Sequence, residues 1–134
     1  KIGIGVMIFK EGKILMGRRK GSHGAGEYSF PGGHLEYMEG FADCAKRETR
    51  EECGVEIENI RFQLLGNTKL YAPKHYIQVG LIADWKQGEP RLLEPEKIGD
   101  WKWYELTSLP KPLFAMSKVM VDAYQNRLHY YDAQ

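Results

Sequence analysis

Glu48, Glu51 and Glu52 are the residues whose type and spacing most clearly indicate chemistry. If they belong to one helix, a rotation of about 100° per residue brings their carboxylates into one arc roughly 100° wide. Like charges at this spacing repel by a few tenths of a kcal/mol per pair, although a solvated acidic helix face tolerates that cost. Oxygen-only ligand sets select hard cations, and Mg²⁺ usually binds one or two carboxylates together with water and substrate phosphates. The pattern therefore predicts a Mg²⁺ site, with Mn²⁺ as an alternative, that acts on a phosphate ester.

The segment that carries these glutamates has the boundaries of a short helix. Gly40 is an acceptable N-cap, Asp43 adds favourable negative charge to the first turn, and Gly54 suits a left-handed position after the last turn. Small side chains form one stripe, which we expect to pack against the core beside the acidic arc: Ala42, Ala45, Thr49 and Cys53. Charged side chains occupy the remaining face, which we expect to point to solvent: Asp43, Lys46, Arg47 and Arg50.

The glutamates belong to a longer pattern with fixed spacing. It consists of Gly33, five residues, Glu39, seven residues, Arg47-Glu48, and then Glu51-Glu52-Cys53-Gly54-Val55. This pattern matches the Nudix box, and the chain resembles a Nudix hydrolase over nearly its whole length. The resemblance implies that the three glutamates bind a divalent metal, that Glu39 and Arg47 hold the loop against the helix, and that Gly54 ends the helix. Thr49 replaces a more usual aliphatic residue, which concerns local packing and not the chemistry.

The resemblance also implies an α/β fold of the α+β kind, a Nudix α/β/α sandwich with a mixed central sheet. Apolar patterning agrees with this, since it predicts strands over residues 2–9, 14–19, 56–70, 76–85 and 101–104. We expect a bend in the third of these near Gly66-Asn67. A last amphipathic helix is predicted over residues 113–127, with a core face formed by Met116, Val119, Met120 and Ala123.

Candidate phosphate-binding residues lie between the second strand and the box. Arg18, Arg19 and Lys20 end that strand, and the flexible residues 21–26, which include Ser22, follow them. Arginine can bind phosphate oxygens with two parallel hydrogen bonds, so we expect Arg18 and Arg19 to bind the substrate phosphates. A solvated hairpin end is the structural alternative for each side chain.

Two loops supply the other candidate substrate-binding residues. Gly32 and Gly33 let the backbone approach a ligand closely, and His34 either hydrogen-bonds the substrate or fixes the loop. His34 is a poor ligand for Mg²⁺, which disfavours imidazole. The loop that contains Tyr71 and His75 either contacts the base of a nucleotide or simply connects two strands.

Length and charge limit the possible functions. The 134 residues are expected to form a single domain, residues 1–134. Nineteen basic and 18 acidic residues give a net charge of +1, which lacks the basic footprint of a polynucleotide binder. No apolar run is long enough to span a membrane and residues 1–9 do not resemble a signal peptide, so we expect a cytoplasmic protein. Cys44 and Cys53 are expected to be reduced packing residues.

Three further segments narrow the resemblance to the nucleotide triphosphate diphosphatase branch of the Nudix family. They are residues 17–26, His75-Tyr76, and Glu94-Pro95-Glu96-Lys97 with the following Trp101-Lys102-Trp103. This branch implies a homodimer that hydrolyses nucleoside triphosphates, including oxidised or modified purine nucleotides, to a monophosphate and pyrophosphate. One of the three glutamates, or Glu96, would take the proton of the attacking water. Nucleotide sugars, ADP-ribose and dihydroneopterin triphosphate are alternative substrates, and a nucleotide sensor without turnover is a further alternative.

Overall fold

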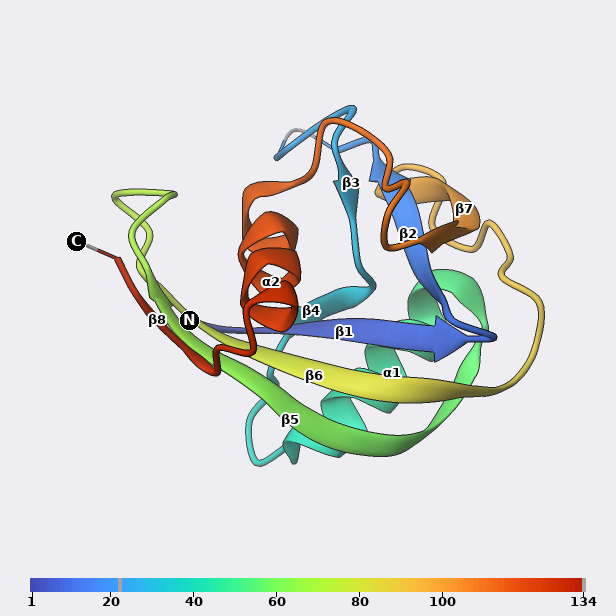
Figure 1. The fold of residues 1–134 in the computed structure, drawn as a ribbon, viewed down its shortest axis with the longest axis horizontal. Coiled ribbons are helices and arrows are strands. Elements are labelled where there is room, and N and C mark those ends of the chain that lie inside the picture. Colours follow the sequence, from blue (N-terminus) through green and yellow to red (C-terminus); the bar gives the residue numbers. More distant parts are fainter. Residues whose placement is uncertain (22, 134) are drawn as a thin grey trace.

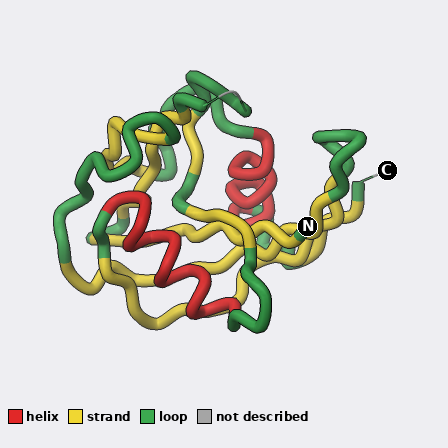
Figure 2. The backbone as a smooth tube through the Cα atoms, turned by 180° about the vertical axis from the view of Figure 1, so that it is seen from behind, coloured by secondary structure: helices red, strands yellow, loops and turns green. Residues whose placement is uncertain are grey.

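The computed structural model describes residues 1–21 and 23–133, so Ser22 lies outside the described residues. Within that part of the chain, one mixed sheet lies between two helices, α1 (Phe41–Cys53) and α2 (Ala115–Gln125). The strands are β1 (Ile2–Lys10), β2 (Lys13–Arg19), β3 (Tyr28–Ser29), β4 (Gly32–His34), β5 (Glu56–Thr68), β6 (Tyr76–Gln87), β7 (Ile98–Glu105) and β8 (Tyr130–Asp132). Helix α2 lies in front of the sheet in Figure 1, and α1 lies in front in the reverse view of Figure 2. The predicted α/β/α sandwich with a mixed central sheet is confirmed.

Strand β1 is the centre of the sheet. It pairs in parallel with β6 along most of its length and, at Phe9 and Lys10, in antiparallel with β2. At the other end of β1, residues 3–5 pair instead with β4. Strand β2 continues away from β1 to pair with β3 and β7, while β5 and β8 extend the other side of β6. The two ends of β1 therefore have different neighbours, and β4 enters beside its N-terminal half.

The side chains of β1 alternate between the two faces of the sheet and contribute to two separate layers of the hydrophobic core. Ile4, Val6 and Ile8 belong to the cluster that includes Cys44, Ala45 and Cys53 of α1. Met7 points to the other face and joins the cluster that includes Met120, Val121 and Ala123 of α2. Because successive side chains in a strand point to opposite faces, one apolar strand supplies both layers.

Three details differ from the sequence-based expectations. Gly66 and Asn67 pair regularly with β6. The irregularities of β5 lie earlier, between Glu56 and Ile57, between Glu58 and Arg61, and between Phe62 and Leu64. Asn59 there has a left-handed backbone (φ 52°), which an asparagine adopts more readily than most residues. The last helix is shorter than residues 113–127, because Leu113 forms a bridge with Tyr28 and Arg127 also has a positive φ. The short strands β3, β4 and β8 were not predicted.

Candidate functional site

Helix α1 begins and ends where its sequence predicts. Gly40 occupies the N-cap, and Gly54 adopts the left-handed conformation (φ 74°) with its N–H donating to the Arg50 carbonyl at 3.0 Å. The buried face differs from the prediction, because Ala42 is exposed and Cys44 is buried. Glu48 and Glu52 also belong to the buried face, so the acidic arc does not lie wholly beside the packing stripe. Two carboxylates are thus held inside the protein, where they need polar partners.

Glu52 is held by the backbone of β4. Its side chain is almost fully buried, and its Oε1 accepts a 2.8 Å hydrogen bond from the Gly32 N–H. A Cβ atom on Gly32 would lie 2.1 Å from the Ile4 carbonyl oxygen, so only glycine allows this approach of β4 to β1. Burial raises the pKa of Glu52 to about 8, although the Gly32 hydrogen bond opposes the shift. Gly32 therefore accommodates the protein's own backbone and directs its N–H to Glu52.

Glu48 packs against Gly33. A Cβ on Gly33 would lie 2.3 Å from the Glu48 carboxyl carbon, so the carboxylate occupies the space that any other residue would fill. Glu48 Oε1 accepts a 2.7 Å hydrogen bond from Arg47 Nη1, while burial raises the pKa of Glu48. We expected Gly32 and Gly33 to let a ligand approach the backbone. The lack of a side chain instead lets Gly32 pack against β1 and Gly33 pack against Glu48, although both glycines also line the pocket described below.

The variant Gly33→Ala tests whether metal binding depends on the position of the Glu48 carboxylate. The added methyl group must displace the Glu48 carboxylate. If Glu48 is a metal ligand, as predicted, divalent metal affinity should fall at least about tenfold, since the ligand and its supporting contacts are disturbed. Gly3→Ala is the matched control, because Gly3 lies on the adjoining strand and a Cβ there meets nothing within 4 Å. Isothermal titration with Mn²⁺ measures the effect. Unchanged affinity in Gly33→Ala would show that Glu48 does not bind metal.

Arg47 connects the loop before α1 to the acidic residues of the helix. Its Nε donates to Glu39 Oε2 at 2.8 Å and its Nη2 to Glu39 Oε1 at 3.0 Å, and this pair lowers the pKa of Glu39 to about 2. Nη2 also donates to the His34 carbonyl at 3.2 Å. The expectation that Arg47 faces solvent is wrong, because its side chain is only 22% exposed and lies among four carboxylates. Arg47 therefore ties the loop of Glu39 and His34 to α1.

Glu51 lies apart from the other two glutamates. Its side chain is half exposed and its Oε2 accepts from Arg47 Nη1 at 3.2 Å. It does not line the pocket, whereas Glu48 and Glu52 do. Accordingly, no three His, Cys, Asp or Glu side chains enclose one ion position among the described residues. Of the three carboxylates that we expected to converge, those of Glu48 and Glu52 line one pocket and that of Glu51 does not.

The donor chemistry nevertheless fits a hard divalent cation. Glu48 and Glu52 offer only oxygen, and both are buried with a raised pKa, so a nearby cation would stabilise their charged forms. A further carboxyl oxygen, Glu94 Oε1, is buried and has no hydrogen-bond partner within the described residues. Glu96, predicted as a possible base from the same loop, is exposed and lies outside the pocket. Glu94 is the loop acid whose charge acts on Glu52.

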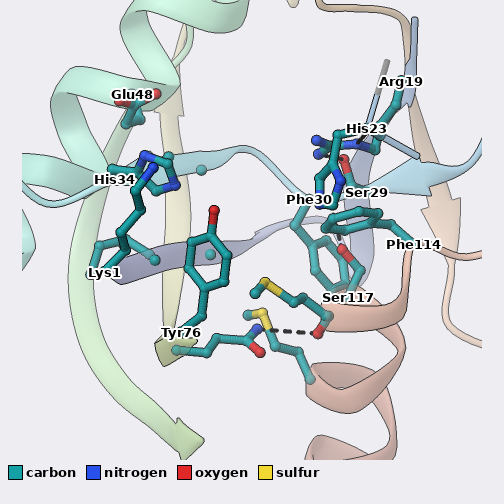
Figure 3. A pocket seen from close by; sticks show the side chains of 18 of the residues that line it. Lys1, Arg19, His23, Ser29, Phe30, His34, Glu48, Tyr76, Phe114 and Ser117 are labelled. Carbon is teal, nitrogen blue, oxygen red and sulfur yellow. Dashed lines mark hydrogen bonds between the residues drawn. The ribbon is translucent and has the colours of Figure 1, made fainter. Parts of the chain in front are cut away.

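A pocket of about 510 Å³ extends from these carboxylates to α2. Figure 3 shows Glu48 at the α1 end, Phe114 and Ser117 at the α2 end, and Arg19 and His23 beside the latter. Cationic side chains line the pocket: Lys1, Arg19, Lys74 and Lys97. The α2 end is mainly apolar and aromatic, with walls formed by Phe30, Tyr76, Phe114, Met116 and Met120. A volume of this size suits a small molecule that carries both charge and an aromatic group.

The basic cluster divides between the two faces of β2. Arg19 enters the pocket, where Nε donates to the His23 carbonyl at 2.9 Å and the guanidinium lies 4.0 Å from the centroid of the Phe114 ring. Burial lowers the pKa of Arg19. Arg18 and Lys20 are exposed and do not line the pocket, because neighbouring side chains in a strand point in opposite directions. Only Arg19 of the three predicted cations therefore faces the site.

The other predicted binding residues differ in position. His34 lines the pocket and stacks on Tyr76 with ring centroids 5.6 Å apart, and burial lowers its pKa. Tyr71 stacks on Phe114 at 5.7 Å and so supports the pocket wall without lining it. The His75 ring hydrogen-bonds Asn67 and lies outside the pocket. Tyr71 is thus close to the site, whereas His75 is not part of it.

Sequence reasoning missed most of the α2 end. Met120 is a core residue, as expected, but it also lines the pocket, as does Met116. Phe30, Phe114 and Ser117, which line it too, had no recognisable local signal. Gln78 did have one, because it is a polar residue inside the apolar run of β6. Its side chain is buried, and its Nε2 donates to the Met116 carbonyl at 3.1 Å. The buried Gln78 amide, which is hydrogen-bonded to α2, therefore forms part of the inner wall of the pocket.

The fold and the site together define a protein with the architecture and acidic box of the Nudix group. The model of the NUDIX domain family matches residues 1–124, and the chain belongs to this family. Among solved structures, the MutT Nudix hydrolase from Burkholderia pseudomallei is similar with a TM-score of 0.85 and 28% identity, covering 91% of this chain and 95% of that one. The Nudix domain of Shewanella oneidensis NrtR in complex with ADP ribose has a TM-score of 0.79 at 17% identity, covering 94% and 86%, which shows the shared fold alone.

Curated relatives are longer than this chain. The NAD-capped RNA hydrolase NudC of Pseudomonas putida is 31% identical over 125 residues, which cover 91% of this chain and 43% of the relative. The chain thus spans less than half the length of such relatives. Within the described residues, no helix has the length and apolar character needed to cross a membrane.

Proposed function

We propose that the protein hydrolyses a nucleoside triphosphate, including oxidised or modified purine nucleotides, to a nucleoside monophosphate and pyrophosphate. One observation carries this proposal: a single pocket joins two buried carboxylates on α1 to an aromatic wall at α2, with cationic side chains along it. The carboxylate end suits metal-bound phosphates, and the aromatic end suits a stacked base. The family match supports hydrolysis as the reaction type.

Glu48 and Glu52 would hold Mg²⁺, or Mn²⁺ in its place, with Glu51 as a third ligand from the same helix. A divalent ion held there would supply charge that neutralises phosphate oxygens and would lower the pKa of a bound water. Arg19 lies beside the α2 end, yet near enough to Glu52 for the two charges to interact, so it would bind the phosphate group nearest the base. Arg47 keeps Glu48 and the preceding loop in place. Of the four acids considered as the base, Glu48 and Glu52 line the pocket, whereas Glu51 and Glu96 do not. We therefore assign proton acceptance to one of the first two.

Gln78 and Ser117 would recognise the edge of the base. The Gln78 amide cannot flip, because its Nε2 must donate to the Met116 carbonyl, and its Oε1 accepts no hydrogen bond within the described residues. The Ser117 hydroxyl accepts from the Phe30 N–H at 3.2 Å and keeps its own proton for donation. Gln78 comes from β6, but the residue to which its amide is bonded, Met116, directly precedes Ser117 in α2. The inner wall therefore offers one fixed acceptor and one hydroxyl to a ligand between Phe30 and Phe114.

Gln78→Leu should change the ranking of nucleotides. A ligand donor that loses its acceptor in a buried site costs about 1–3 kcal/mol, so kcat/KM for the preferred base should fall roughly tenfold or more. Bases that do not use this acceptor should be affected less. Gln87→Leu is the control, since Gln87 ends the same strand and is exposed. A uniform loss for all bases in Gln78→Leu, with normal thermal stability, would contradict base recognition by Gln78.

A second candidate is hydrolysis of a nucleoside diphosphate linked to another group. The NudC relatives are named as NAD-capped RNA hydrolases, which favours such a linkage and argues against our exclusion of polynucleotides. A nucleotide sensor without turnover is less well supported, because the acidic box is intact. The cytoplasmic location and the homodimer implied by the resemblance stay predictions, and light scattering coupled to gel filtration tests the latter.

A substrate panel decides between these candidates. GTP, dGTP, oxidised dGTP, NAD, ADP-ribose and a nucleotide sugar should be incubated with Mg²⁺ and the products resolved by ion-exchange chromatography. We expect the largest kcat/KM for a triphosphate, with pyrophosphate released. A larger kcat/KM for NAD or ADP-ribose would establish the second candidate, and binding without turnover of any compound would establish a sensor.

A further inference from the structure

Lys97 lies between two acidic groups at the carboxylate end of the pocket. Its Nζ is 3.7 Å from Glu52 Oε2 and 3.7 Å from Glu94 Oε1. Glu52 is nearly fully buried, and its other oxygen is already bonded to the Gly32 N–H. Glu94 Oε1 is buried without a hydrogen bond in the described residues. The ammonium is therefore the positive charge next to both of these carboxyl oxygens.

The backbone holds Lys97 in this position on both sides. Its N–H donates to the Glu94 carbonyl at 2.9 Å, and its own carbonyl accepts from the Lys20 N–H at 2.9 Å. The side chain itself is half exposed and lines the pocket. A fixed backbone with a long, flexible side chain lets the ammonium exchange partners without a change of fold.

We propose that Lys97 is a tethered counter-ion, whose ammonium pairs with Glu52 and Glu94 in the metal-free protein and moves to the substrate phosphates when a divalent ion binds. The inference rests on the proposed metal site at Glu48 and Glu52. Two cations cannot share Glu52 Oε2 at close range without strong repulsion, so the ammonium leaves that oxygen. The pocket that Lys97 lines is where the phosphates would then supply new anionic partners.

Metal affinity without nucleotide tests the first half of the proposal. Lys97→Met keeps the length of the side chain and removes the competing charge, so at about pH 8.5, where Glu52 is ionised, Mn²⁺ should bind roughly threefold to tenfold more tightly, measured by electron paramagnetic resonance. Lys97→Arg keeps a competing cation and should bind no more tightly than wild type. Lys74→Met is the control, because Lys74 lines the same pocket but makes no ion pair with a carboxylate among the described residues. Its Mn²⁺ affinity should change less than twofold.

Nucleotide affinity at saturating Mn²⁺ tests the second half. A triphosphate with an α,β-methylene bridge should bind Lys97→Met at least threefold more weakly than wild type, because one phosphate contact is lost. Unchanged Mn²⁺ affinity in Lys97→Met, equal tightening in Lys74→Met, or unchanged nucleotide affinity would each overturn the proposal.

The variant Glu52→Gln distinguishes an error in the proposed metal site from an error in the role of Lys97. If Glu52→Gln binds Mn²⁺ as tightly as wild type does, the metal site itself is wrong and both fail. If Glu52→Gln loses Mn²⁺ binding while Lys97→Met matches wild type, only the role of Lys97 is wrong. Opposite changes in metal and nucleotide affinity in the single variant Lys97→Met would support the exchange of partners.

Discussion

Glu52→Gln is expected to keep the fold and to reduce kcat by about three orders of magnitude, since metal stabilisation of a phosphoryl transition state amounts to several kcal/mol. The glutamine carbonyl can still accept the hydrogen bond from the Gly32 N–H that Glu52 accepts now. The substitution thus removes charge and one potential metal ligand while it keeps the contact between α1 and β4. Steady-state hydrolysis at saturating Mg²⁺ measures the loss, and near-normal turnover would exclude Glu52 as a metal ligand.

The same variant should change how stability depends on pH when no metal is present. The folded-state pKa of Glu52 is raised to about 8 by burial, so the folded protein binds this proton more tightly than the unfolded chain does. Wild type should therefore lose stability as the pH rises from about 4.5, the ordinary range of a glutamate, towards 8. Glu52→Gln lacks this loss and should melt at a higher temperature than wild type at pH 8 in a chelator, with a smaller difference near pH 5.

The control for both measurements is Glu89→Gln, which removes one exposed carboxylate from the loop after β6. It should retain activity and show the pH dependence of wild type. If Glu52→Gln and Glu89→Gln melt alike at pH 8, the carboxylate of Glu52 carries no burial cost in the folded protein.

Arg19→Ala is expected to lower kcat/KM by roughly tenfold to a hundredfold for every nucleotide, because charge-assisted hydrogen bonds contribute about 1.5–3 kcal/mol. Arg19 is the arginine of β2 that lines the pocket, and all nucleotides share the phosphates it would bind. Losses of a contact common to all substrates change the rates by similar factors and preserve the ranking. The measurement is kcat/KM for four triphosphates.

Arg18→Ala is the matched control, since Arg18 precedes Arg19 on the same strand but is exposed and outside the pocket. Its kcat/KM should stay within about threefold of wild type. Tyr71→Ala should instead change the order of base preference, because it removes the stacked support of Phe114. A reordered preference in Arg19→Ala together with an unchanged order in Tyr71→Ala would reverse these assignments.

Local signals were sufficient for α1 and its caps. Gly40, Gly54 and the helical spacing between them depend on nearby residues, and so the predicted ends of the helix agree with the structure. The buried face was predicted less well, because an arc about 100° wide does not show which residues meet the core. Cys44, Glu48 and Glu52 are buried because β4 passes over that side of the helix, a contact between segments that are separate in the sequence.

The α2 end of the pocket could not be predicted for a similar reason. Phe30, Gln78 and Ser117 come from three distant segments, and they meet only through the pairing of β1 with both β4 and β6 and the packing of α2. Arg18 is exposed and Arg19 lines the pocket because successive side chains of β2 point to opposite faces of the sheet. The sequence does not show which face of β2 meets the pocket, so it could not show which of the two arginines does. Short strands such as β8 are held by long-range pairing with β5 and have little pattern of their own.

Hydrolysis of GTP in ¹⁸O-labelled water, followed by ³¹P NMR with Mg²⁺ and with a chelator, identifies the phosphate products and so tests the proposed reaction. We expect GMP and pyrophosphate in equal amounts with Mg²⁺, one of them carrying the label, and no reaction in the chelator until Mg²⁺ is restored. Release of orthophosphate alone, or full activity in the chelator, would contradict the proposed reaction.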